Sequence, residues 1–188
     1  MEKLNLYVLT GGPGAGKTTV LTELQGRGFP CVPEVARQLI QEQTQTGGNA
    51  LPWGNTARYS QQMLERSISS FQETPASQVA FCDRSIPDTL AYCRLIGHSD
   101  TEAMVASLTY RYARKVFLAP PWRAIYATDT ERTQSFEEAV RTCNLIAEVY
   151  AECGYELVEL PLASARERTE FIREYLQAVD HPKLNRFP

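Results

Sequence analysis

The order of hydrophobic and polar positions divides the chain into short apolar runs and longer amphipathic stretches. Short apolar runs are typical of buried strands, whereas apolar residues spaced three or four positions apart indicate helices. The pattern predicts strands at 4–9, 29–33, 78–82, 115–119 and 155–160, and helices at 17–25, 34–45, 56–73, 86–96, 100–112, 136–153 and 165–179. Because strands alternate with helices, we predict an α/β domain with a five-stranded, doubly wound parallel sheet covered on both faces.

The predicted elements form one domain over residues 1–179, and we expect residues 180–188 to be a poorly ordered tail. Helix starts are indicated by serines followed three positions later by an acid, which is the capping-box pattern. These pairs are Ser85 with Asp88, Ser99 with Glu102, Ser135 with Glu138, and Ser164 with Glu167. A chain of 188 residues is long enough to bury roughly 70% of the surface that its unfolded form exposes.

A glycine-rich segment lies between the first predicted strand and the first predicted helix. Residues 11–18 read G-G-P-G-A-G-K-T, a complete match to the phosphate-binding pattern G-x-x-x-x-G-K-[ST]. Glycines let the backbone fold around phosphates, and the N-terminus of the following helix presents unpaired N–H donors to the anion. We therefore predict that a nucleoside triphosphate is bound by Gly11, Gly12, Pro13, Gly14, Ala15, Gly16, Lys17, Thr18 and Thr19.

Three residues are expected to act on the outer phosphates. Lys17 can reach the β- and γ-phosphate oxygens, and the hydroxyl of Thr18 can coordinate Mg²⁺. Asp83 ends the third predicted strand, where a carboxylate can hold Mg²⁺ beside the loop. We predict catalytic roles for Lys17 and Asp83 and a metal site at Thr18 and Asp83. A plain helix-capping role is the alternative for Asp83.

The residue after Asp83 separates the classes of phosphate-loop proteins. A hydrolytic motor of the AAA+ type normally has a glutamate there, whereas this chain has Arg84. A Ras-like GTPase needs D-x-x-G and N-K-x-D, and the sequence has neither at the required place. An arginine beside the metal carboxylate suits the binding of an anionic or hydroxyl-bearing acceptor. The alternative for Arg84 is an ion pair with Asp88 or another neighbour.

The connection between the fourth strand and the long helix, about 120–134, is predicted to be a lid. It carries Arg123 and Arg132, which we predict to be catalytic because arginine offers bidentate donors to the charged transition state of phosphoryl transfer. Each could instead be a solvated loop charge or pair with Asp129 or Glu131.

The acceptor is predicted to bind between the second strand and the third helix. Glu34 follows the second strand, from where its carboxylate can orient an acceptor hydroxyl or take its proton. The predicted acceptor-binding residues are Glu34, Arg37, Arg58, Gln62 and Arg84. Trp53 and Tyr59 could line a pocket for a base or ring. A simple Glu34–Arg37 helix pair and a Trp53 packed on the core are the alternatives.

Charge and cysteine content restrict partners and compartment. The net charge of −3 gives no basic excess for a nucleic-acid backbone, so we expect no nucleic-acid partner. Five cysteines without a C-x-x-C pair indicate reduced thiols in a cytoplasmic protein. Residues 1–3 leave no room for a signal peptide, and no apolar run approaches the roughly 18 residues of a membrane span.

The chain resembles a known family in four blocks: T-G-G-P-G-A-G-K-T-T, V-P-E-V-A-R, D-R-S-I-P-D-T-L-A-Y and G-Y-E-L-V-E-L-P. They are similar to the AAA-type ATPase/kinase-like family grouped with the ribosylnicotinamide kinase domain of NAD-metabolism regulators. The resemblance covers 4–171 and implies a three-layer α/β/α P-loop NTPase fold of nucleotide-kinase type. It also implies that Asp83 and Arg84 lie beside the γ-phosphate, that the lid arginines close over it, and that the loop around Pro161 flanks the base.

These observations lead to two functional hypotheses. The first is a Mg²⁺-dependent kinase that transfers the γ-phosphate of ATP to a small nucleoside-like or other metabolite acceptor. The second is a regulatory or binding module, controlled by ATP or GTP, with weak NTPase activity. The absence of N-K-x-D makes ATP the default nucleotide. The expected partners are thus a nucleoside triphosphate and a small molecule.

Overall fold

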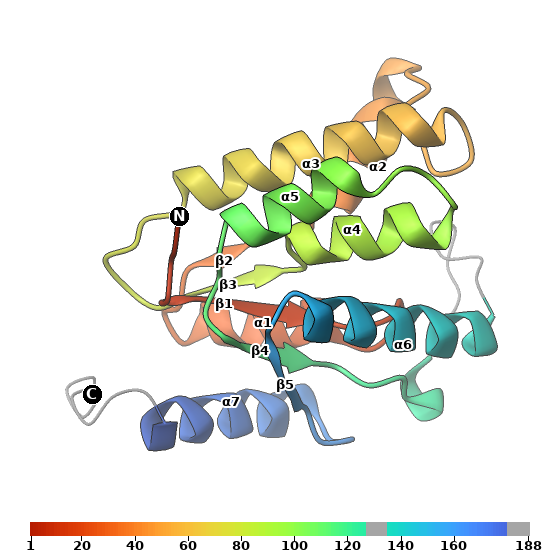
Figure 1. Cartoon of the computed structure of the whole chain (residues 1–188). Helices are drawn as coiled ribbons and strands as arrows, with labels where there is room; N and C mark the ends of the chain where they lie inside the picture. Colours follow the sequence, from red (N-terminus) through yellow and green to blue (C-terminus); the bar gives the residue numbers. More distant parts are fainter. Residues whose placement is uncertain (127–134, 180–188) are drawn as a thin grey trace.

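The computed structural model describes residues 1–126 and 135–179 of the protein. They form one parallel sheet with strand order β2-β3-β1-β4-β5 (Figure 1). The strands are β1 (Leu6–Thr10), β2 (Cys31–Val32), β3 (Ala80–Asp83), β4 (Lys115–Leu118) and β5 (Glu156–Glu159). The helices are α1 (Lys17–Gly26), α2 (Val35–Thr46), α3 (Thr56–Glu73), α4 (Ile86–Leu95), α5 (Thr101–Thr109), α6 (Phe136–Glu152) and α7 (Ala165–Val179), with a short 3₁₀ helix η1 (Arg123–Ile125). The predicted five-stranded parallel sheet is confirmed.

Helices cover both faces of the sheet, because successive side chains of a strand point to opposite sides. Leu6 and Val8 of β1 belong to the hydrophobic core under α3, α4, α5 and α6. Tyr7 and Leu9, the alternate residues, belong to the core under α1 and α7. In Figure 1, α7 lies below the sheet while α3, α4 and α5 lie above it. Each fully buried Leu or Phe contributes roughly 1.5–3 kcal/mol, so the two apolar faces hold the three layers together.

The register of the central strands sets the position of the site. Leu9 of β1 pairs with Asp83 of β3, so the end of β3 lies beside the exit of β1. The loop that follows β1 therefore begins next to a carboxylate at the carboxyl edge of the sheet. Ligands of open parallel sheets bind at this edge.

Two of the predicted helix starts are confirmed in detail. The backbone N–H of Ser135 donates to Glu138 Oε2 at 2.6 Å, and that of Glu138 donates to Ser135 Oγ at 3.2 Å. The same exchange joins Ser164 and Glu167 at 2.9 and 3.3 Å. At the start of α4, the backbone N–H of Ser85 donates to Asp88 Oδ2 at 2.9 Å.

The predicted capping box at Ser99 is wrong. α5 begins one residue later with Asp100 as N-cap, and no side-chain bond caps it. The Asp100 carboxylate instead accepts a hydrogen bond from Arg94 Nε at 2.9 Å. The helix also ends at Thr109 rather than near residue 112, because the backbone N–H of Arg111 donates to the carbonyl of Met1 at 2.7 Å. The N-terminal segment thus pairs with backbone that the sequence had assigned to the last turn of this helix.

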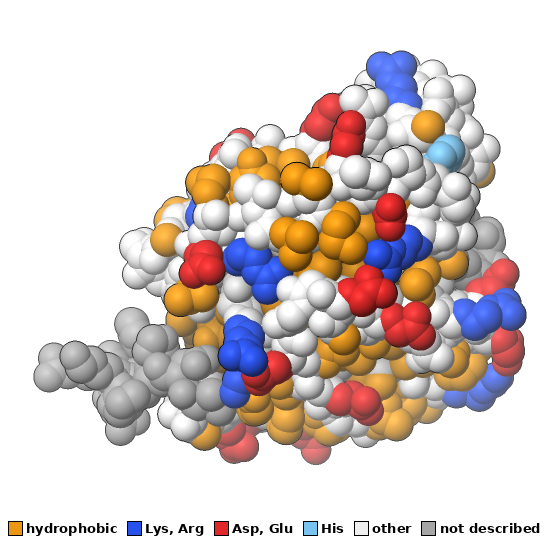
Figure 2. All heavy atoms as spheres, viewed as in Figure 1, with side chains coloured by type: hydrophobic (Ala, Val, Ile, Leu, Met, Phe, Trp, Pro, Cys, Tyr) orange, Lys and Arg blue, Asp and Glu red, His pale blue; other side chains and the backbone are white. Residues whose placement is uncertain are grey.

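Basic and acidic side chains are interspersed on the face of the molecule shown in Figure 2. None of the helices in the described part of the chain has the length and apolar character needed to cross a membrane. The expected tail at 180–188 falls outside the described residues.

Candidate functional site

The phosphate-binding loop connects β1 to α1, and two of its glycines are required by the surrounding structure. The backbone φ is 137° at Gly11 and 72° at Gly14, in the region that favours glycine. A Cβ on Gly11 would lie 2.2 Å from the carbonyl oxygen of Ala119, and one on Gly14 would lie 2.7 Å from Cδ2 of Tyr126. The loop therefore packs against the end of β4 and against the segment after it. Its position at the N-terminus of α1 suits a bound anion.

Lys17 is buried at the first residue of α1, with 6% of its surface exposed. Its Nζ donates to the carbonyl oxygens of Gly11 and Gly12 at 3.1 and 3.0 Å. Burial, followed by the Arg84 guanidinium, lowers the pKa of Lys17 to about 8, although three nearby carboxylates oppose the change. A phosphate oxygen would offer this ammonium a charged partner in place of neutral carbonyls, which makes a stronger hydrogen bond.

Thr18 and Asp83 lie close together, as the sequence predicted. Thr18 Oγ1 donates to Asp83 Oδ2 at 3.4 Å, while Asp83 Oδ1 is buried without a hydrogen-bond partner in the described part of the chain. Burial raises the pKa of Asp83, and the Lys17 ammonium opposes that rise. An unpartnered carboxylate oxygen beside a hydroxyl fits Mg²⁺, which prefers oxygen ligands. The described residues contain no group of three or more His, Cys, Asp or Glu that could hold a metal alone, so phosphate or water oxygens would complete the coordination.

Arg84 joins two carboxylates from different elements. Its Nε donates to Glu34 Oε1 at 2.8 Å and its Nη1 donates to Asp88 Oδ1 at 3.1 Å. The backbone φ of Arg84 is 68°, a conformation that costs of order 1–3 kcal/mol for a residue with a side chain. The ion pair with Asp88 that the sequence offered as an alternative is therefore present, and Glu34 takes part in it as well.

Asp88 is the anchor of this cluster. Besides Arg84, its carboxylate accepts hydrogen bonds from Thr10 Oγ1 and from the Tyr150 hydroxyl, both at 2.5 Å. Thr10 is the last residue of β1, and Tyr150 belongs to α6. The orientation of Arg84 is thus tied to the strand that precedes the phosphate-binding loop.

Glu34 is the N-cap residue of α2 and faces the loop. Burial raises the pKa of Glu34, but the Arg84 guanidinium and the Lys17 ammonium outweigh it, and the net pKa lies below the ordinary value. The carboxylate is therefore ionised at neutral pH. Arg37 Nε lies 3.9 Å from Glu34 Oε2, a longer contact than the one with Arg84.

A cavity of about 920 Å³ connects these groups. The loop residues 13–19 line one side, and Glu34, Arg37 and Arg84 line another. Trp53 and Tyr59 add aromatic wall, and Trp53 is 63% exposed, so it borders the cavity and does not fill it. The volume is at the upper end of the range typical of small-molecule sites, about 300–1,000 Å³.

Two predicted acceptor residues do not line this cavity. Arg58 is exposed, and its backbone N–H donates to Asn55 Oδ1 at the start of α3. Gln62 is half-buried, and its Oε1 has no hydrogen-bond partner in the described residues. Both side chains remain predictions as acceptor ligands, and the structure brings Glu34, Arg37 and Arg84 together without them.

The two predicted lid arginines differ in outcome. Arg123 lies in η1 with its side chain 71% exposed, donates to Glu137 Oε1 at 2.7 Å, and covers the ring of Phe136. It does not line the cavity. Arg132 lies outside the described residues. From the same connection, Trp122 and Ile125 line the cavity instead.

Sequence reasoning missed Arg168. This residue of α7 lines the cavity with 1% of its surface exposed. Its Nη1 donates to the carbonyl of Ala15 in the loop at 2.7 Å, and its Nε donates to that of Pro161 at 2.8 Å. A signal was available, because Arg168 precedes Ile172 by four positions and so lies on the apolar face of its helix.

The family model described as AAA domain matches residues 6–168. Among curated proteins, none matches the sequence. Among solved structures, the NadR protein in complex with NR superposes with a TM-score of 0.71 at 17% identity, over 97% of this chain and 52% of that one.

Two further structures are similar over almost their whole length. Thymidylate kinase from Ehrlichia chaffeensis has a TM-score of 0.61 at 16% identity, over 92% of this chain and 97% of that one. The YorR protein from Bacillus subtilis, in complex with phosphorylated GDP, has a TM-score of 0.54 at 15% identity, over 94% and 99%. The likeness confirms the predicted three-layer P-loop fold of nucleotide-kinase type.

Proposed function

The chain belongs to the AAA domain family, and from that premise we propose that it is a Mg²⁺-dependent kinase that phosphorylates a small, hydroxyl-bearing acceptor with ATP. One observation carries the proposal: a single cavity joins the phosphate-binding loop to Glu34, Arg37 and Arg84. A protein that only hydrolysed or sensed a nucleotide would not need a second, charged compartment beside the γ-phosphate position.

The nucleotide half of the cavity is assigned to residues 11–19. The backbone N–H groups of the loop and of the start of α1 bind the phosphates, and Lys17 exchanges its two carbonyl partners for phosphate oxygens. Thr18 and Asp83 would hold Mg²⁺, which when bound neutralises charge on the outer phosphates. ATP is the default nucleotide, and GTP is tested beside it because the YorR structure contains phosphorylated GDP.

The acceptor half is assigned to the side of the cavity that carries Glu34 and Arg84. An ionised Glu34 accepts a hydrogen bond from the acceptor hydroxyl and can take its proton as the hydroxyl oxygen bonds to the γ-phosphorus. The bond from that phosphorus to the β,γ-bridging oxygen breaks, and ADP leaves. Trp53, Tyr59 and Pro52 form the apolar part of this wall, which suits a planar ring such as a nucleobase.

A screen for acceptor-dependent ADP formation tests the proposal. The purified chain is mixed with Mg²⁺ and ATP or GTP, and nucleosides, nucleotides and related metabolites are added one at a time, with Lys17→Ala as the inactive control. We expect at least one acceptor to raise the formation of ADP, or of GDP where GTP is supplied, without release of inorganic phosphate. ADP or GDP that always appears together with an equal amount of phosphate, whatever is added, would contradict the kinase assignment.

A nucleotide-dependent regulatory or binding module is the second candidate. The position of Arg123 favours it, because this arginine is exposed and paired with Glu137 and does not reach the cavity. The same screen separates the two, since a module binds the nucleotide but shows no acceptor-dependent turnover. In either role we place the protein in the cytoplasm, because all five cysteines are free and thiols stay reduced there.

A further inference from the structure

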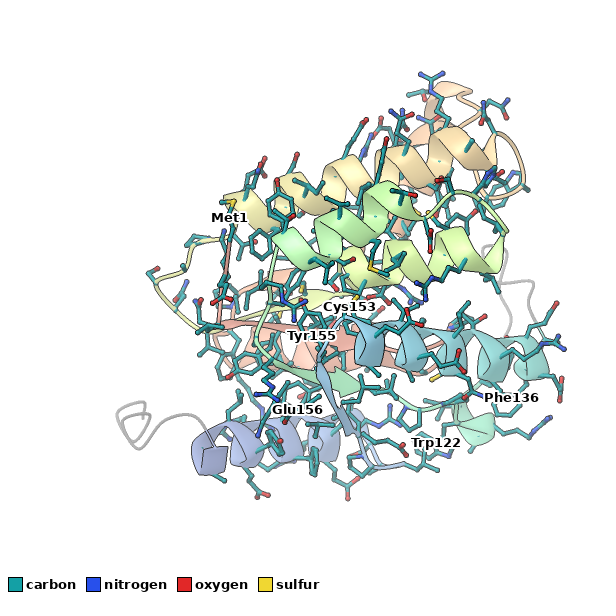
Figure 3. All side chains as sticks on the ribbon, in the orientation of Figure 1. Met1, Trp122, Phe136, Cys153, Tyr155 and Glu156 are labelled. Carbon is teal, nitrogen blue, oxygen red and sulfur yellow. The ribbon has the colours of Figure 1, made fainter. Side chains whose placement is uncertain are left out.

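Arg168 lies where three segments that border the cavity meet. Its guanidinium hydrogen-bonds the loop carbonyl of Ala15 and the carbonyl of Pro161, which follows β5. It also lies over the indole of Trp122, 5.2 Å from the ring centre. Figure 3 places Trp122 at the same end of the molecule as Phe136, the first residue of α6. One side chain of α7 thus connects the phosphate-binding loop, the segment after β4 and the segment after β5.

The chemical setting of Arg168 is unusual for a buried cation. In the described part of the chain no carboxylate forms an ion pair with it, and its Nη2 is buried without a hydrogen-bond partner. Burial lowers the pKa of its guanidinium. A buried charge is normally paired, because removing it from water is unfavourable. We therefore expect the role of this unpaired guanidinium to lie in the segments that its rigid fork of donors holds in place.

The segments after β4 and β5 border the cavity on the side away from Glu34, because β4 and β5 lie on the opposite side of β1 from β2, the strand that precedes Glu34. Residues 163–165 and Trp122 line the same cavity as the loop, and Arg168 links Trp122 to Ala15 of the loop. With the γ-phosphate directed toward Asp83 and Glu34, a triphosphate in the loop would place its nucleoside toward residues 163–165 and Trp122. If these segments separated from the loop, the phosphates would still be bound while the base would lose its walls. The hydrogen bonds and ring contact of Arg168 hold the segments after β4 and β5 close to the loop.

We propose that Arg168 is a positioning residue for the nucleoside part of the triphosphate, because its guanidinium clamps the segment after β5 and Trp122 to the phosphate-binding loop. This inference rests on the proposed nucleotide-binding function. This role depends on the shape of the guanidinium as well as on its charge. A lysine has no planar fork and cannot bond two carbonyls and stack on an indole at once.

The test compares ATP with inorganic tripolyphosphate, which has the phosphates but no nucleoside. Dissociation constants for both ligands are measured by calorimetry with Mg²⁺ for the wild type, Arg168→Lys and Arg168→Gln. Arg166→Gln is the matched control, since Arg166 is exposed on the same helix. We expect both Arg168 variants to bind ATP at least about tenfold more weakly, because two charge-assisted hydrogen bonds are lost or misplaced. Tripolyphosphate affinity should change less than about threefold, since Lys17 and the loop remain.

Three results would overturn the inference. Equal losses for ATP and tripolyphosphate would mean that Arg168 acts on the phosphate cradle itself. Full ATP affinity in Arg168→Lys would mean that a positive charge is sufficient. Unchanged ATP affinity in both variants would mean that the clamp has no role in binding. Once an acceptor is known, the Arg168 variants should raise the KM for ATP with kcat nearly unchanged.

Trp122→Ala provides an independent test if the Arg168 variants do not fold. Trp122 is half-buried, so its removal leaves no closed core cavity, and the two carbonyl bonds of Arg168 remain. We expect ATP affinity to fall at least about threefold from the lost stacking, with tripolyphosphate affinity retained. Unchanged ATP affinity would contradict the clamp. A wild type that binds neither ligand would instead refute the proposed function.

Discussion

Replacing Lys17 by Met should stabilise the protein without nucleotide while abolishing nucleotide binding. The ammonium of Lys17 is buried against neutral carbonyls, and its pKa is lowered from 10.5 to about 8. At pH 7 the side chain is charged in both the folded and the unfolded chain. The folded state therefore holds a charge that the unfolded state solvates better.

The magnitude follows from the pKa difference. A lowering of 10.5 to about 8 corresponds to about 3 kcal/mol of destabilisation below pH 8. Met removes this effect but leaves the carbonyls of Gly11 and Gly12 without the donor, which costs about 1–2 kcal/mol. The net gain at pH 7 is about 1–2 kcal/mol, or a rise in Tm of roughly 2–8 °C for a chain of this length.

The effect should reverse with pH. Because the folded pKa of Lys17 lies below the unfolded one, the unfolded chain binds more protons between pH 8 and 10.5. The stability of the wild type therefore rises with pH across that window, whereas the variant lacks this contribution. At pH 7 the variant should be the more stable protein, and near pH 10 the wild type should be.

Urea unfolding followed by circular dichroism at pH 7, 8.5 and 10 measures this difference. The same measurement is repeated at pH 7 with saturating Mg²⁺-ATP. At a concentration of 100 times Kd, ATP should stabilise the wild type by about 2.7 kcal/mol and should not stabilise the variant. A variant that is less stable than the wild type at pH 7, or a difference that does not change with pH, would refute the reasoning. It would show that the cluster around Lys17 compensates its charge fully.

Three further substitutions test other parts of the site. Asp83→Asn should lower turnover by at least about 100-fold and raise the Mg²⁺ concentration needed, because a neutral amide replaces the charged ligand; an unchanged Mg²⁺ titration of ADP formation would contradict this. Glu34→Gln should lower kcat/KM for the acceptor at least about tenfold, with the ATP Kd from calorimetry unchanged, and an equal loss of ATP affinity would argue against an acceptor role. Gly14→Ala should lower the free energy of unfolding by about 1 kcal/mol or more, since Gly14 has a positive φ and faces Tyr126. A variant with the same urea midpoint as the wild type would contradict this.

The sheet and the phosphate-binding loop were predictable because their signals are local. Residues 11–18 carry a fixed pattern between an apolar run and a helix, and the structure places them between β1 and α1. The proximity of Thr18 and Asp83 was predictable too, since parallel strands end at one edge. The bounds of α5 were not, because its N-cap residue Asp100 accepts a hydrogen bond from Arg94 and its far end is followed by backbone that pairs with the N-terminal segment.

The remainder of the site depends on long-range packing that no short pattern encodes. Arg123 was expected at the phosphates from its place in the connection, yet its partner Glu137 was not among the alternatives that local sequence suggested. Arg168 is separated from Ala15 by 153 positions, so only the packing of α7 beside α1 brings them together. A basic residue on the apolar face of a helix was the available signal.

The charges of the site also indicate the kind of acceptor it can take. Arg84 already donates to Glu34 and Asp88, so an anionic acceptor would have to displace a carboxylate from this arginine. Removing Arg84 from Glu34 is unfavourable, because this largely buried carboxylate would keep only the longer contact with Arg37 and the field of Lys17. A neutral acceptor meets no such opposition: its hydroxyl can donate to Glu34 while the ion pairs stay intact. If the proposed kinase function holds, we therefore expect a neutral, nucleoside-like acceptor rather than a phosphorylated one, and in the acceptor screen nucleosides should outperform nucleotides.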